Sequence, residues 1–143
     1  MLSGQFDHAC DEKFRLRLPT RIKAEIGTSF FITKGNDGCL FILSAGQMNN
    51  LLNKTDALPM FDSVAQKALR LLYSSAFEIT EDNQGRFLLP QVLREFAGIK
   101  KEVVFVGAGN RAELWAADKW NAYKEDLDKN FDLIVSELGK HGI

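Results

Sequence analysis

Basic and apolar side chains alternate in a short stretch near the start of the chain, residues 11–19, which read DEKFRLRLP. In a strand, Lys13, Arg15 and Arg17 would share one face, because side chains two residues apart point to the same side. Clustered cations of this kind neutralise phosphates, and arginine can also donate to guanine edges in the major groove of DNA. An ordinary solvated strand shows the same alternation, so the spacing by itself leaves both interpretations open.

The sequence around this stretch is also basic. Residues 13–34 hold six basic residues and one acidic residue, whereas residues 112–143 hold seven acidic residues and four lysines. Arg21 joins the candidate DNA-binding residues on spacing alone. The net charge of the whole chain is −1, but an anionic polymer responds to the local field. The charge distribution therefore favours a nucleic acid as the partner of the basic stretch.

Two aspartates, Asp11 and Asp82, are the best candidates for catalysis, since paired carboxylates can act as acid and base. In aspartic proteases a small hydroxyl residue and a glycine follow the aspartate, whereas Glu12 and Asn83 follow here. Closure of a turn by acceptance of backbone N–H bonds, or pairing with a nearby arginine, explains both aspartates more simply. The sequence also lacks an HExxH motif and a nucleophile–base–acid set. We expect no enzymatic activity, no cofactor and no metal site.

The composition is that of an ordinary folded domain, with 45% hydrophobic and 26% charged residues among 143. No apolar run approaches the roughly 18 residues that a membrane-spanning helix needs. The first residues also lack the basic-then-apolar pattern of a secretory leader, so the cytoplasm is the expected location. Cys10 and Cys39 lack metal-binding spacing and are expected to be reduced, buried thiols.

The chain contains an internal repeat with an offset of 71 residues. Five residue types recur at this offset, in the pairs Asp11 and Asp82, Arg15 and Arg86, Leu18 and Leu89, Pro19 and Pro90, and Gly27 and Gly98. Each copy continues with an apolar run, a glycine-containing turn, a second apolar run and a helical pattern. Such a repeat predicts two similar units that build one fold.

Each copy is expected to form a strand, a short helix, a hairpin and a further helix. Pro19 and Pro90 end the strand and can begin a helix, where the missing N–H costs nothing. Gly27 and Gly98 follow at the place where a helix takes a left-handed residue to finish. Residues 36–38, Asn-Asp-Gly, supply the turn of the first hairpin. One such unit is too small to bury a sound core, so each half is expected to supply strands to the other.

The expected fold class is α+β, mainly β, with two pseudo-repeated β-α-β-β halves and flanking helices. We expect the first repeat over residues 1–55, a connecting helix within 56–76, the second repeat over 77–120 and a C-terminal helix over 121–143. The apolar stripe of the C-terminal helix is expected to be intramolecular core or a subunit contact, and its members are Trp120, Tyr123, Leu127, Phe131, Ile134 and Leu138.

Five segments resemble, in order and spacing, the sequence pattern of the MraZ family, bacterial transcriptional regulators of the AbrB-like type. The segments read DEKFRLRLP, ITKGNDGCLFIL, ALRLLYSSAFE, DNQGRFLLPQVLREFAGI and EVVFVGAGNRAELW. The match as a whole covers roughly residues 4–120. The resemblance implies an intramolecular AbrB-like swapped-hairpin barrel, no enzymatic activity, and ring-shaped homo-oligomers of eight or more chains. It also implies sequence-specific binding to tandem direct repeats in double-stranded DNA. These repeats lie upstream of the family's own gene, at the head of the division and cell-wall cluster, so the resemblance implies association with the nucleoid.

DNA contacts in this family centre on the basic residues of the DxxGR motif, which correspond here to Lys13, Arg15 and Arg86. The first copy departs from the motif, because Phe14 stands where the family has glycine. A glycine there can serve a positive φ, at which a bulky residue costs roughly 1–2 kcal/mol. The turn is therefore either remodelled or tolerant, with Phe14 packed on another part of the protein. The alternative function is an antitoxin-type module that docks a protein partner through residues 118–143.

Overall fold

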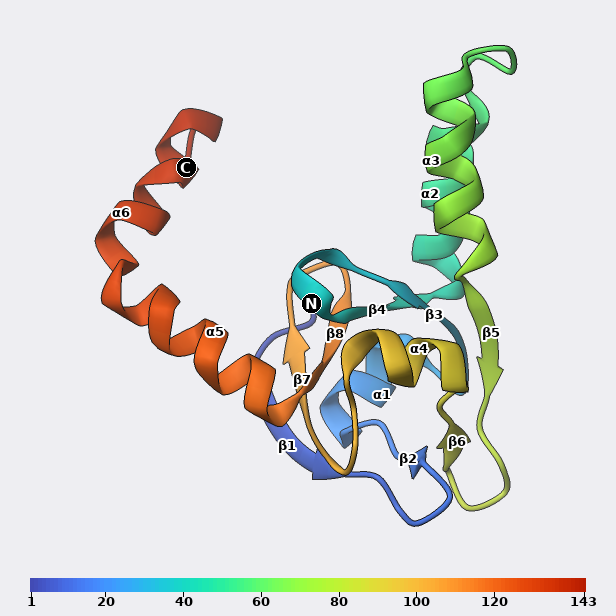
Figure 1. Ribbon diagram of the computed structural model, residues 1–143, viewed down its shortest axis with the longest axis vertical. Helices are drawn as coiled ribbons and strands as arrows, with labels where there is room; N and C mark the ends of the chain where they lie inside the picture. Colours follow the sequence, from blue (N-terminus) through green and yellow to red (C-terminus); the bar gives the residue numbers. More distant parts are fainter.

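The computed structural model describes residues 1–143 and has an α+β architecture built from two similar halves (Figure 1). The first half comprises β1 Gln5–Ala9, β2 Arg15–Leu16, α1 Thr20–Ile26, β3 Ser29–Lys34, the 3₁₀ turn η1 Asn36–Gly38, β4 Leu40–Ser44 and α2 Ala45–Asp56. After α3 Ser63–Ser74, the second half comprises β5 Phe77–Thr80, β6 Phe87–Leu88, α4 Gln91–Ala97, β7 Glu102–Gly107, β8 Ala112–Ala116 and α5 Ala117–Lys129. The chain ends in α6 Phe131–Val135 and the 3₁₀ segment η2 Ser136–His141. The predicted α+β class is confirmed, but the chain is not mainly β, because more of its residues lie in helices than in strands.

Six strands form one antiparallel sheet in the order β1-β7-β8-β4-β3-β5, and β2 pairs with β6 in a separate two-stranded ladder. When each strand is replaced by its counterpart in the other half, the same order results, read from the opposite edge of the sheet. Strand β1 of the first half pairs with β7 of the second, and β5 of the second half pairs with β3 of the first. At the centre, β4 and β8 pair with each other. Each hairpin is therefore extended by the first strand of the other half.

The structure corrects the expected β-α-β-β half in two ways. Each half begins with an additional strand, β1 or β5, whose sequence signal is weak because these strands bury few side chains. The strand expected over DEKFRLRLP is also shorter, since β2 contains only Arg15 and Leu16. Lys13 lies in the turn before it, where Phe14 has a positive φ of 59° and its N–H donates to the Asp11 carbonyl. Lys13 and Phe14, which the alternating basic and apolar pattern placed in a strand, therefore belong to this turn.

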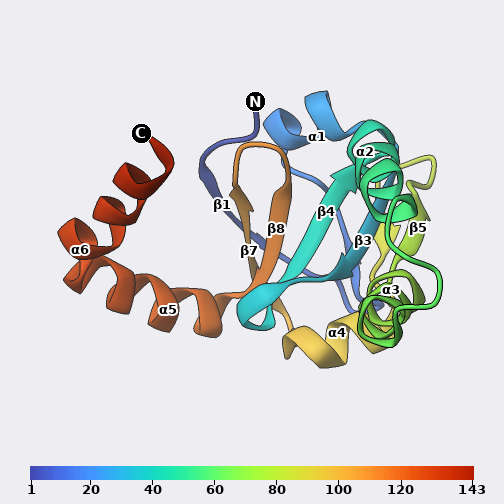
Figure 2. The ribbon, with the colours of Figure 1, turned by 90° about the horizontal axis from the view of Figure 1, so that it is seen from above.

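The main core is enclosed by the six-stranded sheet, α1, α4 and the β2–β6 ladder. Seen from above, α1 and α4 lie on opposite sides of the body (Figure 2). Leu16 pairs with Phe87, its own counterpart in the repeat, so an approximate twofold axis passes between them. Phe87 is buried and meets the Phe30 ring edge-on at 5.3 Å. Pro19 and Pro90 directly precede α1 and α4, as the sequence predicts.

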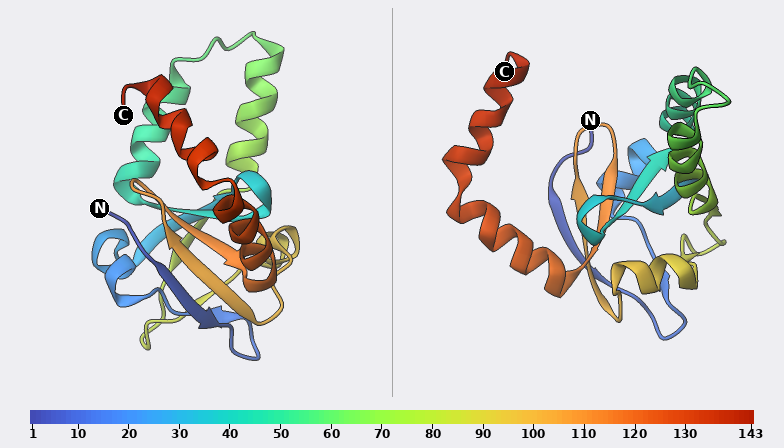
Figure 3. Two further views of the ribbon diagram at one scale, coloured as in Figure 1. Left: turned by 90° about the vertical axis from the view of Figure 1, so that its left-hand side faces the viewer. Right: turned by 45° about the horizontal axis from the view of Figure 1, so that its top comes forward.

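Two helical arms leave the body on opposite sides, and both rise away from β2 and β6 (Figures 1 and 3). Helices α2 and α3 form one arm, and a hydrogen bond between the Thr55 and Tyr73 hydroxyls joins them. The C-terminal arm consists of α5, α6 and η2 rather than one helix, because the chain leaves helical geometry at Asn130. None of the helices has the length and apolar character that crossing a membrane requires.

The apolar stripe of the C-terminal arm divides into a packed part and an exposed part. Trp120 is buried, and the Tyr123 ring stacks on Trp115 with 4.9 Å between centroids, so α5 is anchored to the outer face of the sheet. Farther along, Phe131 is 60% exposed and Leu138 is 45% exposed, because the arm has left the body. The expected intramolecular core is therefore limited to the first turns of α5. Cys10 and Cys39 are free and buried, as the sequence predicts.

We expect Phe87→Ala to lower the free energy of unfolding by about 3–5 kcal/mol, because it removes a buried ring at the pseudo-twofold axis. Phe61→Ala is the matched control, since Phe61 is 95% exposed and its loss should change stability by at most about 0.5 kcal/mol. Chemical denaturation followed by circular dichroism measures both values. Equal stabilities of the two variants would contradict the assignment of Phe87 to the shared core.

Candidate nucleic-acid interface

The two copies of the repeated motif form the same tight turn, and an aspartate closes each one. Asp11 Oδ1 accepts the backbone N–H groups of the residues two and four positions later, both at 2.9 Å. Asp82 Oδ1 accepts the equivalent two N–H groups at 2.8 and 2.9 Å. The interpretation of both aspartates as turn-closing residues is confirmed. Their carboxylates are occupied by this structural task.

The second oxygen of each carboxylate orients an arginine. Arg15 Nε donates to Asp11 Oδ2 at 2.7 Å, and Arg86 Nε donates to Asp82 Oδ2 at 3.2 Å. Both arginine side chains are partly exposed. Their terminal guanidinium nitrogens make no hydrogen bond within the chain, so each turn presents a directed pair of donors. A guanidinium held in this way suits bidentate recognition of phosphates or guanine edges.

Hydrogen bonding sets the ionisation of these carboxyl groups. The backbone N–H of Arg15 lowers the pKa of Asp11, and the Arg15 side chain and the Lys13 N–H lower it further, against the opposing effect of desolvation. The backbone N–H of Arg86 is likewise the main reason that the pKa of Asp82 is lowered. Both aspartates therefore stay ionised at neutral pH and keep the turns closed.

The β2–β6 ladder brings arginines from both copies together. A surface hollow is lined by Arg15, Arg17 and Arg86, together with His8, Ala9, Asp11 and Leu16. It lies at the end of the body where β2 and β6 run, opposite the helical arms (Figure 1). Three of the five predicted DNA-binding residues thus converge on one surface, although Arg86 is distant in sequence from Arg15 and Arg17.

The other two predicted residues lie outside this hollow. Lys13 is exposed in the turn that precedes Arg15, so it borders the same end of the body. Arg21 is exposed on α1 and lines a different hollow, with Met1 and Glu25 among its neighbours. The structure therefore joins Lys13 to the arginines and separates Arg21 from them.

Two residues of this surface were not among the sequence candidates. His8 lines the hollow and meets the Phe105 ring edge-on at 5.4 Å. Leu88 pairs with Arg15 across the ladder and is 61% exposed, which places an apolar side chain beside the cations. Leu88 is the counterpart of Arg17 in the repeat, so the offset of 71 residues could have identified it. No sequence signal pointed to His8, because β1 was not expected.

Phe14 adopts the backbone conformation of the glycine that it replaces. Its φ is 59°, and its counterpart Gly85 has a φ of 75°. The turn is therefore not remodelled, and Phe14 carries the cost of about 1–2 kcal/mol that a non-glycine residue incurs there. The Arg94 guanidinium lies over the Phe14 ring, 3.7 Å from its centroid. Of the two possibilities left open by the sequence, the structure selects a packed Phe14.

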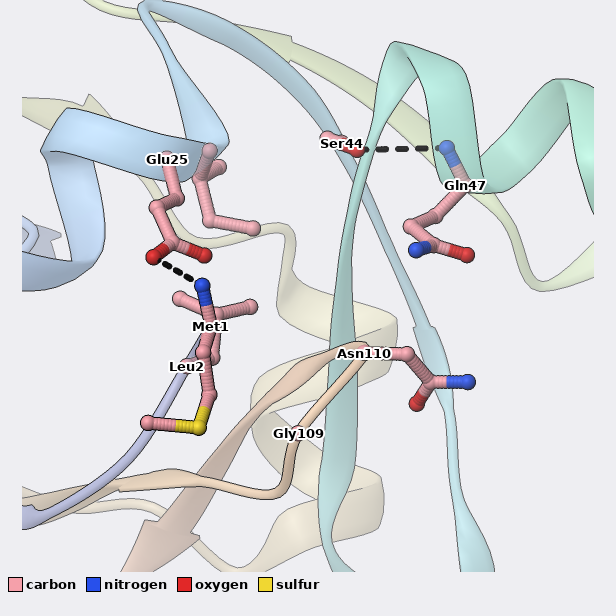
Figure 4. Close-up of a pocket in the computed structure, with 8 residues that line it drawn as sticks. Met1, Leu2, Glu25, Ser44, Gln47, Gly109 and Asn110 are labelled. Atoms are coloured by element: carbon pink, nitrogen blue, oxygen red, sulfur yellow. Dashed lines mark hydrogen bonds and ion pairs between the residues drawn. The ribbon is translucent and has the colours of Figure 1, made fainter.

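A second hollow, around the N-terminus, has a different character (Figure 4). The ammonium group of Met1 pairs with Glu25, and the Ser44 hydroxyl accepts the backbone N–H of Gln47 at 3.2 Å. Asn110 is the remaining polar residue that lines this hollow. The charges of the Met1 ammonium and the Glu25 carboxylate neutralise each other. This hollow lacks the excess of cations that marks the β2–β6 end.

Comparison with known proteins identifies relatives over the whole chain. A family model described as "MraZ protein, putative antitoxin-like" matches residues 72–137. The transcriptional regulator MraZ of Alkaliphilus metalliredigens is 37% identical over 143 residues, which is 100% of both chains. That of Symbiobacterium thermophilum is 42% identical over 136 residues, covering 95% of this chain and 99% of the relative. That of Heliobacterium modesticaldum is 38% identical over 138 residues, covering 96% of each.

The lowered pKa values of Asp11 and Asp82 predict a specific loss of stability in acid. A group with a lowered pKa stabilises the fold above its unfolded pKa, and this contribution is lost as pH falls through the folded pKa. We expect the double variant Asp11→Asn, Asp82→Asn to be less stable than wild type at pH 7. The difference should shrink once pH falls below the ordinary carboxyl pKa of 3.8.

Urea denaturation at a series of pH values measures this difference. Asp56→Asn serves as the control for loss of an exposed carboxylate, since Asp56 lies at the end of α2 away from both turns. A stability difference that is the same at every pH would contradict the role of the ionised carboxylates.

Proposed function

Because this chain belongs to the MraZ family, whose curated relatives are named transcriptional regulators, we propose that it regulates transcription by sequence-specific binding to double-stranded DNA. Its relatives are named as regulators rather than enzymes, which confirms the expectation of a non-enzymatic protein. The proposed binding surface is the cationic end of the body, defined as Lys13, Arg15, Arg17 and Arg86. No cofactor enters this proposal.

The observation that carries the proposal is the convergence of Arg15, Arg17 and Arg86 on one hollow, with Arg15 and Arg86 held alike by aspartates. An ordinary solvent-exposed strand would not require an aspartate to hold an arginine in the same way in both copies. Bracing reduces the side-chain freedom that must be lost on binding, which favours affinity. Arg15 and Arg86 are proposed to read base edges, whereas Lys13 and Arg17, both exposed, are proposed to neutralise phosphates. Arg21 would contact only the DNA phosphate backbone on the flank of this surface.

We further propose that the operator consists of tandem direct repeats upstream of the chain's own gene, in the division and cell-wall cluster. A ring of eight or more copies would present one cationic end to each repeat. Contacts that are weak individually then add through effective concentration. Such binding would associate the protein with the nucleoid.

Exposed apolar side chains on the two arms support self-association. On α3, Val64 is 77% exposed and Leu71 is 73% exposed; on α6, Phe131 is 60% exposed and Leu133 is 73% exposed. Two different patches on one chain suit a head-to-tail contact, which closes into a ring when the rotation between copies permits. We propose that the α3 patch of one copy packs on the α6 patch of the next.

The exchange of β1 and β5 between the halves supports the AbrB-like swapped-hairpin barrel as the finer description of the fold. We propose this barrel together with the division into a first repeat over residues 1–55, a connecting segment over 56–76, a second repeat over 77–120 and a C-terminal arm over 121–143.

The exposed tail also supports a second candidate function, docking of a protein partner in the manner of an antitoxin. The α6 patch would then contact a different protein rather than another copy of this chain. A partner that copurifies stoichiometrically, in the absence of salt-dependent DNA binding, would favour this alternative.

We expect Arg15→Ala to weaken binding to the DNA upstream of the gene by tenfold or more, which corresponds to at least about 1.4 kcal/mol and lies within the range for a base-reading arginine. Arg17→Ala should instead lower the slope of log affinity against log salt by about one. Gel shift and fluorescence anisotropy over a range of salt concentrations measure both effects. Arg70→Ala on α3 is the control, and equal binding by Arg15→Ala and Arg70→Ala would overturn the assigned surface.

We expect wild-type protein to have a molar mass in solution of at least eight chains. The double variant Leu71→Asp, Leu133→Asp should shift this mass toward a single chain, because it places charges in both proposed contact patches. Light scattering coupled to size-exclusion chromatography measures the mass. A variant that keeps the wild-type mass, or a wild type that is monomeric, would contradict assembly through these arms.

A further inference from the structure

Around the two turns, three corresponding positions carry a different residue type in each half. Relative to the offset of 71 residues, Phe14 corresponds to Gly85, Arg94 to Lys23 and Cys10 to Glu81. In each half, the basic residue of this group is supplied by the short helix of the other half. Lys23 on α1 lies at the second turn, and Arg94 on α4 lies at the first.

At the second turn, an ion pair occupies the space beside the glycine. Lys23 Nζ lies 2.8 Å from Glu81 Oε2, and the Glu81 side chain is 4% exposed. A Cβ added at Gly85 would lie 3.6 Å from Lys23 Nζ and 3.8 Å from this carboxylate oxygen. These are ordinary van der Waals distances, so the ion pair lies directly beside the glycine.

At the first turn, the carboxylate is missing and a ring takes its place. Cys10 stands where the other half has Glu81, and its buried thiol stays neutral because desolvation raises its pKa to about 11. Arg94 therefore has no acidic partner at this position. Its guanidinium instead lies 3.7 Å from the centroid of the Phe14 ring, a geometry in which the ring face attracts the cation. The phenylalanine that breaks the glycine motif supplies this ring.

The Phe14–Arg94 contact is coupled to the DNA-facing surface through the backbone. The Phe14 carbonyl accepts the N–H of Leu89 at 3.1 Å, and Phe14 immediately precedes Arg15. A shift of Phe14 would therefore move the backbone that orients the Arg15 guanidinium. The positive φ of Phe14 is strained, and a strained conformation persists only where the surrounding structure holds it in place.

We propose that Arg94 is a positioning residue for DNA binding, which holds Phe14, and through it Arg15, by stacking on the ring in place of the ion pair used by the other half. This inference rests on the proposed DNA-binding function and adds to it a residue outside the cationic hollow. The two halves thereby secure the same turn by different chemistry, Arg94 on a ring and Lys23 on a carboxylate.

A double-mutant cycle on the full-length chain tests the proposal, with the duplex upstream of the gene as the probe. Arg94→Ala should weaken binding by about threefold to tenfold, the range expected for loss of a cation–π contact. In a Phe14→Leu background, which keeps an apolar side chain without a ring, Arg94→Ala should change affinity less than about twofold. Arg94→Lys should restore only part of the affinity, because lysine lacks the planar group that stacks.

Amide hydrogen exchange at Leu89 gives a readout without DNA. Arg94→Ala should accelerate this exchange, whereas Arg70→Ala, which removes an exposed cation on α3, should leave it unchanged. Thermal unfolding of each variant establishes that the proteins compared are folded. If Arg94→Ala does not fold, Phe14→Leu alone must show both the weaker binding and the faster exchange.

Each contrary outcome has a distinct meaning. Equal losses from Arg94→Ala with and without the Phe14 ring would show that Arg94 contacts DNA directly and would overturn the positioning role. Unchanged binding by Arg94→Ala, while Arg15→Ala still weakens binding, would overturn this inference and leave the proposed function intact. If Arg15→Ala also leaves binding unchanged, the proposed function itself fails. If Arg94→Ala in addition leaves the exchange of Leu89 unchanged, the Phe14–Arg94 contact does not hold the turn either.

Discussion

The rest of the structure depends on the exchange of first strands between the two halves. Strand β1 extends the hairpin of the second half and β5 extends that of the first, so neither half completes its sheet alone. The exchange places Leu16 opposite its counterpart Phe87 and brings β2 and β6 side by side. Arg15 and Arg86, which this pairing brings together, line one hollow with Arg17. The proposed DNA-binding surface is therefore a product of both copies rather than of either copy alone.

Within that constraint, the two turns show how a repeated motif can diverge without changing shape. Both aspartates close their turns with the same pair of backbone bonds and orient an arginine with the remaining oxygen. Behind the turns, one half packs a lysine on a buried carboxylate, whereas the other packs an arginine on a ring. The two halves share the left-handed backbone conformation at this position but not the residue type, since Phe14 and Gly85 both have a positive φ.

Much of this architecture could be predicted from the sequence, because spacing reports local chemistry. The offset of 71 residues identified the two halves, the prolines marked the starts of α1 and α4, and the aspartates were recognised as turn-closing residues. Strands β1 and β5 were missed, since an edge strand with few buried side chains has little periodicity. The Phe14–Arg94 contact was also missed, because it joins positions distant in sequence and depends on the pseudo-twofold packing. The apolar stripe of the tail was identified, but its period cannot tell core from an exposed arm.

Hydrogen–deuterium exchange of the full-length protein, with and without the DNA upstream of its gene, tests the central claim most directly. The claim is that both copies of the repeated motif form one DNA-binding surface. We predict that DNA slows exchange in residues 11–18 and 82–89 together, while the α2–α3 arm exchanges at the same rate in both states. Protection confined to the arms, or to only one of the two motifs, would contradict the account.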